Sequence, residues 1–189
     1  KPVNWTSSDI VVKVKKTMGY KKVGHGGTLD PFATGLLPIF IGPYTKLASL
    51  FHDADKRYST TLSLGKKTDT ADHTGKVIKE IKVRPLTQMQ CKLVERALIG
   101  KVKLSIPIYS AKKVQGTPLY KLAREQKITS SQRYQVIHIH ELSIKLIDSS
   151  TINFTAKVSS GTYIRALGEL IAHKLSTIGH LSSLERQAY

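Results

Sequence analysis

A glycine-rich segment near the N-terminus carries two side chains that could do chemistry. Residues 24–31 read Gly-His-Gly-Gly-Thr-Leu-Asp-Pro. Three glycines in four positions permit backbone conformations that other residues resist, and they allow close approach to a ligand. A carboxylate such as Asp30 is ionised near neutral pH, since its ordinary pKa is about 3.9, and it can act as a nucleophile. Asp30 followed by Pro31 is equally typical of a turn, so both interpretations stay open on residue type alone.

Common nucleotide and metal sites do not fit this segment. A phosphate-binding P-loop needs Gly-Lys-Ser/Thr at a fixed spacing, and a dinucleotide fingerprint leads from a strand into a helix. A metal held by His25 and Asp30 would need further ligands, and none follow at a diagnostic spacing. Cys91 is the only cysteine, which excludes a cysteine zinc cluster and suits a reducing cytoplasm. We therefore expect no metal, no organic cofactor and a cytoplasmic location.

The elements that must position these residues can be predicted from apolar spacing. A first helix is capped by Ser7 or Ser8 and ends at Gly19, a second runs from Thr87 to Gly100, and a third begins near Thr162. Their apolar faces comprise Ile10, Val11, Val14 and Met18 in the first, Leu93, Val94, Ala97 and Leu98 in the second, and Ile164, Leu167, Leu170, Ile171 and Leu175 in the third.

Alternating apolar residues predict strands between these helices. The expected strands are 37–41, 57–64, 77–83, 134–147 and 151–158. Several follow one another without an intervening helix, which favours antiparallel hairpins and an α+β class over a doubly wound parallel sheet. No repeat and no linker divides the chain, so we expect residues 1–189 to form one domain.

The net charge of +17 indicates a polyanionic partner, because neutralising phosphates releases counterions and is a common source of affinity. The stretch 105–133 is rich in basic residues with tyrosines between them. Basic groups follow phosphates and rings stack on bases, so this stretch suits an RNA-gripping insertion, although a solvated surface helix and loop would have the same composition. The longest apolar run, 36–41, is far too short to span a bilayer.

The run 22–37 closely resembles the catalytic motif of the TruB-type tRNA pseudouridine synthases. Other segments resemble further motifs of that family in its order, namely 1–9, 55–58 with 65–72, 107–116, 160–165 and 180–186. The resemblance covers essentially the whole chain and is far more specific than a lone glycine-rich loop. It implies the pseudouridine synthase fold, with a mixed, mainly antiparallel central sheet flanked by helices and a basic insertion at about 105–133.

The resemblance also implies an isomerase that converts uridine to pseudouridine in the T-loop of tRNA, at position 55. Asp30 matches the family's essential aspartate, which attacks the target nucleoside so that the base detaches, turns and rejoins through carbon. Arg165 matches the arginine that pairs with that aspartate and keeps it ionised. Tyr58 matches the active-site tyrosine, which lies against the base and is a candidate for proton transfer at carbon.

Substrate contacts follow from the same resemblance. His25 matches a histidine that enters the RNA loop and helps to displace the target nucleotide, since a stacked uridine hides its reacting atoms. Tyr163 and Leu184 match apolar walls of the pocket, and both also suit a plain core. The basic residues expected to contact RNA are Lys1, Lys112 and Lys113. The expected partner is the T-arm stem-loop of tRNA, bound by a monomer without a membrane.

Some positions depart from the family pattern. Asn4 stands where the family has glycine, which is tolerable because Asn enters left-handed conformations readily. Family members usually continue into a C-terminal, PUA-like RNA-binding domain that is not present in this chain, which stops at Tyr189. Asp69 and Asp72 suit a turn, and the sequence assigns them no further role. Two alternatives stay open, a catalytically silent RNA-binding or tRNA-chaperone protein and a guide-RNA-dependent synthase.

Overall fold

A six-stranded sheet forms the centre of the molecule in the computed structural model, which describes residues 1–110, 112–125 and 133–189. In spatial order its strands are β2 (Thr34–Gly35), β12 (Gly179–Ala188), β4 (Lys56–Leu64), β11 (Thr151–Val158), β10 (Tyr134–Asp148) and β7 (Gly100–Ser105). Within it β2 and β12 run parallel, and the other neighbouring strands run antiparallel. The expected α+β class with a mixed, mainly antiparallel sheet is confirmed.

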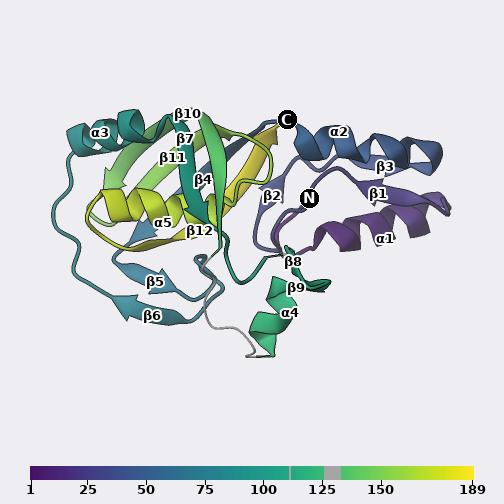
Figure 1. The fold of residues 1–189 in the computed structure, drawn as a ribbon, viewed down its shortest axis with the longest axis horizontal. Coiled ribbons are helices and arrows are strands. Elements are labelled where there is room, and N and C mark those ends of the chain that lie inside the picture. The colour runs from purple at the N-terminus through teal and green to yellow at the C-terminus, as the bar shows by residue number, and fades with distance from the viewer. Residues whose placement is uncertain (111, 126–132) are drawn as a thin grey trace.

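Strand β4 shows how one face of the sheet meets the core. Its side chains alternate between buried and half-exposed along the whole strand, as expected when successive residues point to opposite faces. Helix α5 (Ile164–Lys174) packs against β4 and β12, and helix α3 (Gln88–Leu98) packs against β10 (Figure 1). The two helices therefore seal the apolar face and leave the other face more polar and accessible.

The strand predictions hold where the strands pair over their full length. The expected strands 57–64, 134–147 and 151–158 are confirmed to within one residue at each end. The expected strands 37–41 and 77–83 are shorter, because their partners are short. Strand β3 (Ile39–Ile41) pairs with the three-residue β1 (Val23–His25), and β6 (Val77–Glu80) pairs with the three-residue β5 (Lys66–Thr68).

Strand β12 is a long element that apolar alternation did not predict. It lies between β2 and β4 and runs through the centre of the site described below. Its pairing with β4 shifts by one residue between Leu181 and Ser183, and such a bulge interrupts the period-two pattern. Pairing on both sides forms this strand, and it places Leu184 and Arg186 on the buried face.

The N-terminus of α1 (Ser7–Met18) corrects one prediction. The cap is Thr6 and not Ser7 or Ser8, because the Thr6 side chain accepts a hydrogen bond from the Asp9 amide while the Asp9 carboxylate accepts one from the Thr6 amide. Ser7 has a different task, since its buried hydroxyl accepts a hydrogen bond from the Leu29 amide at 2.9 Å. The first helix is thereby attached to the segment that carries Asp30.

The other helix ends agree with the predictions, whereas parts of the apolar faces do not. Thr87 caps α3, α5 begins two residues after Thr162, and Gly19 ends α1 in a left-handed conformation with φ of 71°. Three residues expected on apolar faces are exposed, namely Met18, Leu93 and Ala97. The reason in α3 is its rotation, which turns Cys91, Val94 and Leu98 toward the sheet.

Shorter elements surround the sheet. The hairpin of β1 and β3 lies with α1, the 3₁₀ helix η1 (Gly42–Leu47) and α2 (Ala48–Asp53) on one side of the molecule (Figure 1). The basic stretch contains β8 (Lys113–Val114), β9 (Thr117–Pro118) and α4 (Leu119–Arg124), and residues 111 and 126–132 lie outside the described part. None of the helices in the described part is long and apolar enough to cross a membrane.

Candidate active site

Asp30 lies in a loop that joins strand β1 to strand β2 at the edge of the sheet. Both ends of the loop are held by strand pairing, β1 with β3 and β2 with β12. Within the loop, the Ala33 amide donates to the Asp30 carbonyl at 3.0 Å, which makes the turn that Asp-Pro predicts. The Asp30 side chain is 35% exposed, so its carboxylate is accessible from solvent.

The glycines of this region are required by space as well as by conformation. A Cβ atom on Gly26 would lie 2.9 Å from side-chain atoms of both Phe40 and Phe51. A Cβ atom on Gly35, where φ is 104°, would lie 2.2 Å from the Arg186 carbonyl oxygen. A larger residue at either position would move the backbone that carries Asp30.

Arg165 pairs with Asp30 through two hydrogen bonds. Its Nε donates to Asp30 Oδ2 at 2.8 Å, and its Nη2 donates to Asp30 Oδ1 at 3.3 Å. Arg165 lies in the first turn of α5 and its side chain is 4% exposed. Such a two-pronged contact fixes the orientation of the carboxylate. The predicted pairing of these two residues is confirmed.

The remaining donors of Arg165 reach two other parts of the chain. Nη1 donates to the Thr70 carbonyl at 2.8 Å, and Nη2 donates to the Tyr109 carbonyl at 2.8 Å. Backbone carbonyls satisfy a buried guanidinium without competing for its charge. Arg165 therefore joins the Asp30 loop to the turn at 68–75 and to the beginning of the basic stretch.

Asp72 lies in a turn and also beside Arg165. Its Oδ1 accepts hydrogen bonds from the Thr70 hydroxyl at 2.9 Å and from the Thr74 amide at 2.9 Å, so the expected turn is confirmed. Its Oδ2 lies 3.9 Å from Arg165 Nε, and its side chain is buried. Asp69 supports the same turn, since its Oδ1 accepts from the Lys76 amide at 2.8 Å. One arginine therefore has a carboxylate on each side.

Tyr58 lies in strand β4 with its side chain facing the core and 7% of the residue exposed. Burial raises the pKa of its phenol above the ordinary value, while the charge of Arg186 and a hydrogen bond with Arg186 oppose that rise. The negative charge of Asp30 adds to the increase. Tyr58 is therefore a neutral phenol at physiological pH, and it lies within the electrostatic reach of Asp30.

His25 ends strand β1 and is half-buried. Its Nδ1 accepts a hydrogen bond from the Gly27 amide at 3.3 Å, an arrangement that places the proton of a neutral ring on Nε2. Burial lowers the pKa of the imidazole, and the positive charges of His52 and Arg186 lower it further. Among the described residues, no three His, Cys, Asp or Glu side chains come together as a metal site.

Tyr163 and Leu184 belong to the core, which the sequence had left open. Tyr163 precedes α5 and packs against the core, and Leu184 is buried in it.

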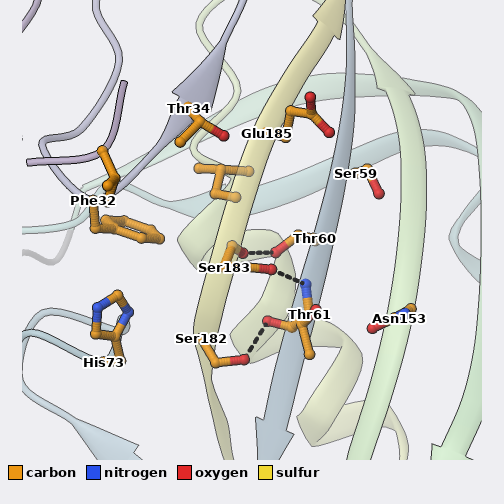
Figure 2. A pocket seen from close by; sticks show the side chains of 12 residues that line it. Phe32, Thr34, Ser59, Thr60, Thr61, His73, Asn153, Ser182, Ser183 and Glu185 are labelled. Carbon is orange, nitrogen blue, oxygen red and sulfur yellow. Dashed lines mark hydrogen bonds between the residues drawn. The ribbon is translucent and has the colours of Figure 1, made fainter. Parts of the chain in front are cut away.

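Leu184 also lines a hollow, which Figure 2 shows. The paired strands β4 and β12 form one wall of this hollow, and the rings of Phe32 and His73 form another. The hollow is lined mainly by hydroxyl and amide side chains, and none of the three predicted catalytic residues lines it. Its polar surface is distinct from the Asp30–Arg165 pair.

The three lysines predicted to contact substrate differ in their surroundings. The Lys1 ammonium donates to the carbonyls of Pro2, Trp5 and Pro31, so it attaches the N-terminal segment to the residue that follows Asp30. Asn4 in that segment has a φ of 65°, as its replacement of glycine requires. Lys112 is exposed at the beginning of the β8–β9 hairpin, and the Lys113 side chain lies outside the described residues. Their contact with RNA stays a prediction.

Arg186 was missed as an individual residue. It belongs to the segment 180–186 that resembles a family motif. Its side chain is 1% exposed and lies beneath the Asp30 loop, where it donates to the carbonyls of Gly27 and Leu36. Residues two apart in a strand share a face, so the burial of Arg186 beside Leu184 follows from their spacing. This inference requires the knowledge that 179–188 is a strand, which apolar alternation does not predict.

Comparisons with known sequences identify a family for this chain. The family model described as TruB family pseudouridylate synthase (N terminal domain) matches residues 15–164. The chain is 44% identical over 186 residues to tRNA pseudouridine synthase B of Hydrogenovibrio crunogenus, covering 98% of this chain and 61% of that protein. It is 47% identical over 189 residues to the protein of the same name in Caldicellulosiruptor saccharolyticus, covering 98% and 64%. It thus spans less than two thirds of these curated relatives.

Solved structures show the same fold. A Cbf5-Nop10-Gar1 complex contains a chain that matches with a TM-score of 0.74 and 25% identity, covering 98% of this chain and 46% of that chain. An H/ACA RNP bound to a substrate RNA containing 2′-deoxyuridine matches with a TM-score of 0.71 and 22% identity, covering 98% and 44%. The second likeness concerns the fold alone.

Proposed function

This chain belongs to the TruB family of pseudouridylate synthases, and we propose on that basis that it isomerises uridine to pseudouridine in the T-loop of tRNA, at position 55. The observation that carries the proposal is the pair of Asp30 and Arg165. A partly exposed carboxylate is held in a fixed orientation by a buried guanidinium, and the neutral phenol of Tyr58 lies within the electrostatic reach of that carboxylate. This is the arrangement that a carboxylate nucleophile needs.

Asp30 is the nucleophile in this proposal. Arg165 holds the plane of the carboxylate, while the exposure of the side chain lets a bound nucleoside reach it. Attack by the carboxylate forms a transient bond to the nucleoside and detaches the base, which turns and rejoins the ribose through carbon as the bond to Asp30 breaks. The bond between C1′ and N1 breaks, a bond between C1′ and C5 forms, C5 loses a proton and N1 gains one. No electrons or water are consumed, so the balance requires no redox cofactor.

Tyr58 and His25 prepare the base for this rearrangement. Tyr58 is the candidate group for the proton transfer at C5. Because burial raises the pKa of its phenol, it acts by relaying a proton, accepting one at its oxygen while it releases its own. Its ring can lie against the base, an interaction worth about 1–3 kcal/mol for each stacked base. The lowered pKa of His25 keeps its ring neutral, which suits a side chain that displaces the target nucleotide from its stack. Tyr163 and Leu184 complete the apolar wall.

The substrate is the T-arm stem-loop of a tRNA, bound by a monomer in the cytoplasm. The net charge of +17 supports binding to a phosphate backbone. The stretch 105–133 acts as the RNA-gripping insertion of a single catalytic domain, with Lys112 and Lys113 on phosphates. Its beginning is already joined to the site, because the Tyr109 carbonyl accepts from Arg165.

A conversion assay tests the proposal. The protein is incubated with an unmodified tRNA transcript or a T-arm stem-loop, and pseudouridine at the T-loop position is measured. Wild type should convert it, whereas Asp30→Asn should bind the RNA without conversion. Asp148→Asn is the matched control, because Asp148 lies in the exposed hairpin turn between β10 and β11. Tight binding by wild type with no conversion would overturn the proposal in favour of an RNA-binding or chaperone function.

A further inference from the structure

Arg186 is the largest fully buried side chain in the described part of the chain, although it carries a charge. No ion pair joins it to a carboxylate within that part, and burial of an unpaired charge is costly unless hydrogen bonds replace its hydration. Its guanidinium is instead satisfied by backbone carbonyls. A buried cation that binds only backbone fixes the position of that backbone.

The carbonyls that Arg186 contacts lie at the two ends of one loop. Its Nε donates to the Leu36 carbonyl at 2.8 Å, and its Nη2 donates to the Gly27 carbonyl at 3.1 Å. The Arg186 carbonyl in turn accepts from the Leu36 amide at 2.8 Å. Asp30 lies between these two ends. The planar guanidinium, with donors in a rigid fork, thus closes the loop 27–36 at its base.

Arg186 also lies beside two tyrosines. It is the cross-strand neighbour of Tyr58 in the pairing of β12 with β4, and its Cζ lies 4.8 Å from the ring centroid of Tyr189. The Tyr189 hydroxyl donates to the Gly26 carbonyl at 3.3 Å, one residue before the loop. Arg186 therefore connects the backbone that carries Asp30 with the tyrosine that faces the base.

We propose that Arg186 is a positioning residue for the isomerisation, which ties both ends of the 27–36 loop to strand β12 and so fixes Asp30 relative to Tyr58. This inference rests on the proposed function. Arg186 acts through the loop and not on the substrate, since its side chain is buried. A misplacement of about 1 Å in a reacting group can cost about a hundredfold in rate, so a small relaxation of the loop is sufficient to matter.

Two substitutions separate the effect of the positive charge of Arg186 from that of its several hydrogen-bond donors. Arg186→Lys keeps the charge but cannot reach both ends of the loop, and Arg186→Gln keeps a single amide donor. Arg96→Lys is the matched control, because Arg96 is exposed on α3. The measurements are kcat and KM with a tRNA transcript, and hydrogen exchange of peptides from the loop and from strands β4 and β11.

Both Arg186 variants should lower kcat by about 10- to 100-fold while KM for tRNA stays within about twofold. Exchange should rise in the loop peptide and stay unchanged in β4 and β11. An unchanged kcat with unchanged loop exchange would overturn the inference. A rise in exchange spread over the whole sheet would also overturn it, because it would mark Arg186 as a residue of general stability.

The wild-type protein supplies a test that needs no variant. If Arg186 holds the loop, the Ala33 amide inside it should exchange as slowly as amides of β12, and exchange typical of an open loop would contradict the inference. The exchange measurements also separate the two proposals. Suppose that loop exchange is slow, that Arg186→Lys makes it fast, and that the protein converts no uridine. This result would support the role of Arg186 in holding the loop and would refute the proposed activity.

Discussion

Asp72 Oδ2 lies 3.9 Å from Arg165 Nε, on a guanidinium that is already bonded to Asp30. Two carboxylates from distant segments therefore flank one buried arginine. Asp72 also shapes the turn whose Thr70 carbonyl accepts from Arg165 Nη1. The orientation of Arg165, and through it that of Asp30, is thus determined jointly by the loop at 27–36 and the turn at 68–75.

Asp30→Asn should abolish conversion while leaving RNA binding nearly unchanged. The amide has the shape of the carboxylate and can keep the turn, but it is no nucleophile. Removal of a catalytic nucleophile costs at least about a thousandfold in rate, so single-turnover conversion of a tRNA transcript is the measurement. A variant that retains a tenth of the wild-type rate would exclude Asp30 as the nucleophile.

Arg165→Lys should impair both activity and stability. A lysine ammonium can reach Asp30 but cannot also serve the carbonyls of Thr70 and Tyr109, which then lose their buried donors. We expect a rate reduction of about 10- to 100-fold from misorientation and a loss of about 1–3 kcal/mol in unfolding free energy. Urea unfolding and single-turnover kinetics measure the two effects. Wild-type stability in the variant would contradict the conclusion that Arg165 joins the Asp30 loop to the turn at 68–75 and to the basic stretch.

Asp72→Asn should reduce activity less than a change of Asp30. The amide oxygen can keep the hydrogen bond from the Thr74 amide, so the turn should persist, but the charge beside Arg165 is lost. We expect a reduction of about tenfold in kcat with KM for tRNA unchanged. Asp69→Asn is the control, because Asp69 supports the same turn without contacting Arg165 in the described structure. Equal losses in both variants would show that only the turn matters.

The folded protein should lose stability as His25 becomes protonated. Burial lowers the pKa of His25 below its ordinary value of 6.5, so the unfolded chain binds a proton at a pH at which the folded chain does not. The penalty is absent well above pH 6.5, grows as the pH falls from there, and is complete below the folded pKa. Urea unfolding of wild type and His25→Gln at several pH values isolates this contribution from other histidines. A pH-independent difference would contradict it.

Lys112→Ala should weaken RNA binding in proportion to one lost phosphate contact. Because each contact releases counterions, the slope of log Kd against log salt concentration should fall by about one unit. Lys174→Ala removes the same charge from the exposed end of α5 and serves as the control. An unchanged slope in Lys112→Ala would remove this residue from the RNA contacts.

The sequence by itself determined the local elements and, through the resemblance to a family, the predictions for the reacting groups. Helices α3 and α5 and strands β4, β10 and β11 follow from apolar spacing and end signals, because these patterns depend on neighbouring residues only. The motif around Asp30 and its companions at Tyr58 and Arg165 identified the family, and the pairing of Asp30 with Arg165 followed from it. Residue type and order were sufficient for these predictions.

Only the tertiary structure decided what surrounds those groups. Strand β12 forms because it pairs on both sides, despite a bulge that hides its alternation, and this pairing buries Arg186 beneath the Asp30 loop. Asp72 and Asp30 meet at one guanidinium although 42 positions separate them in the printed sequence. Contacts between distant segments depend on how strands pair and helices pack, and no local pattern in the chain encodes those distances.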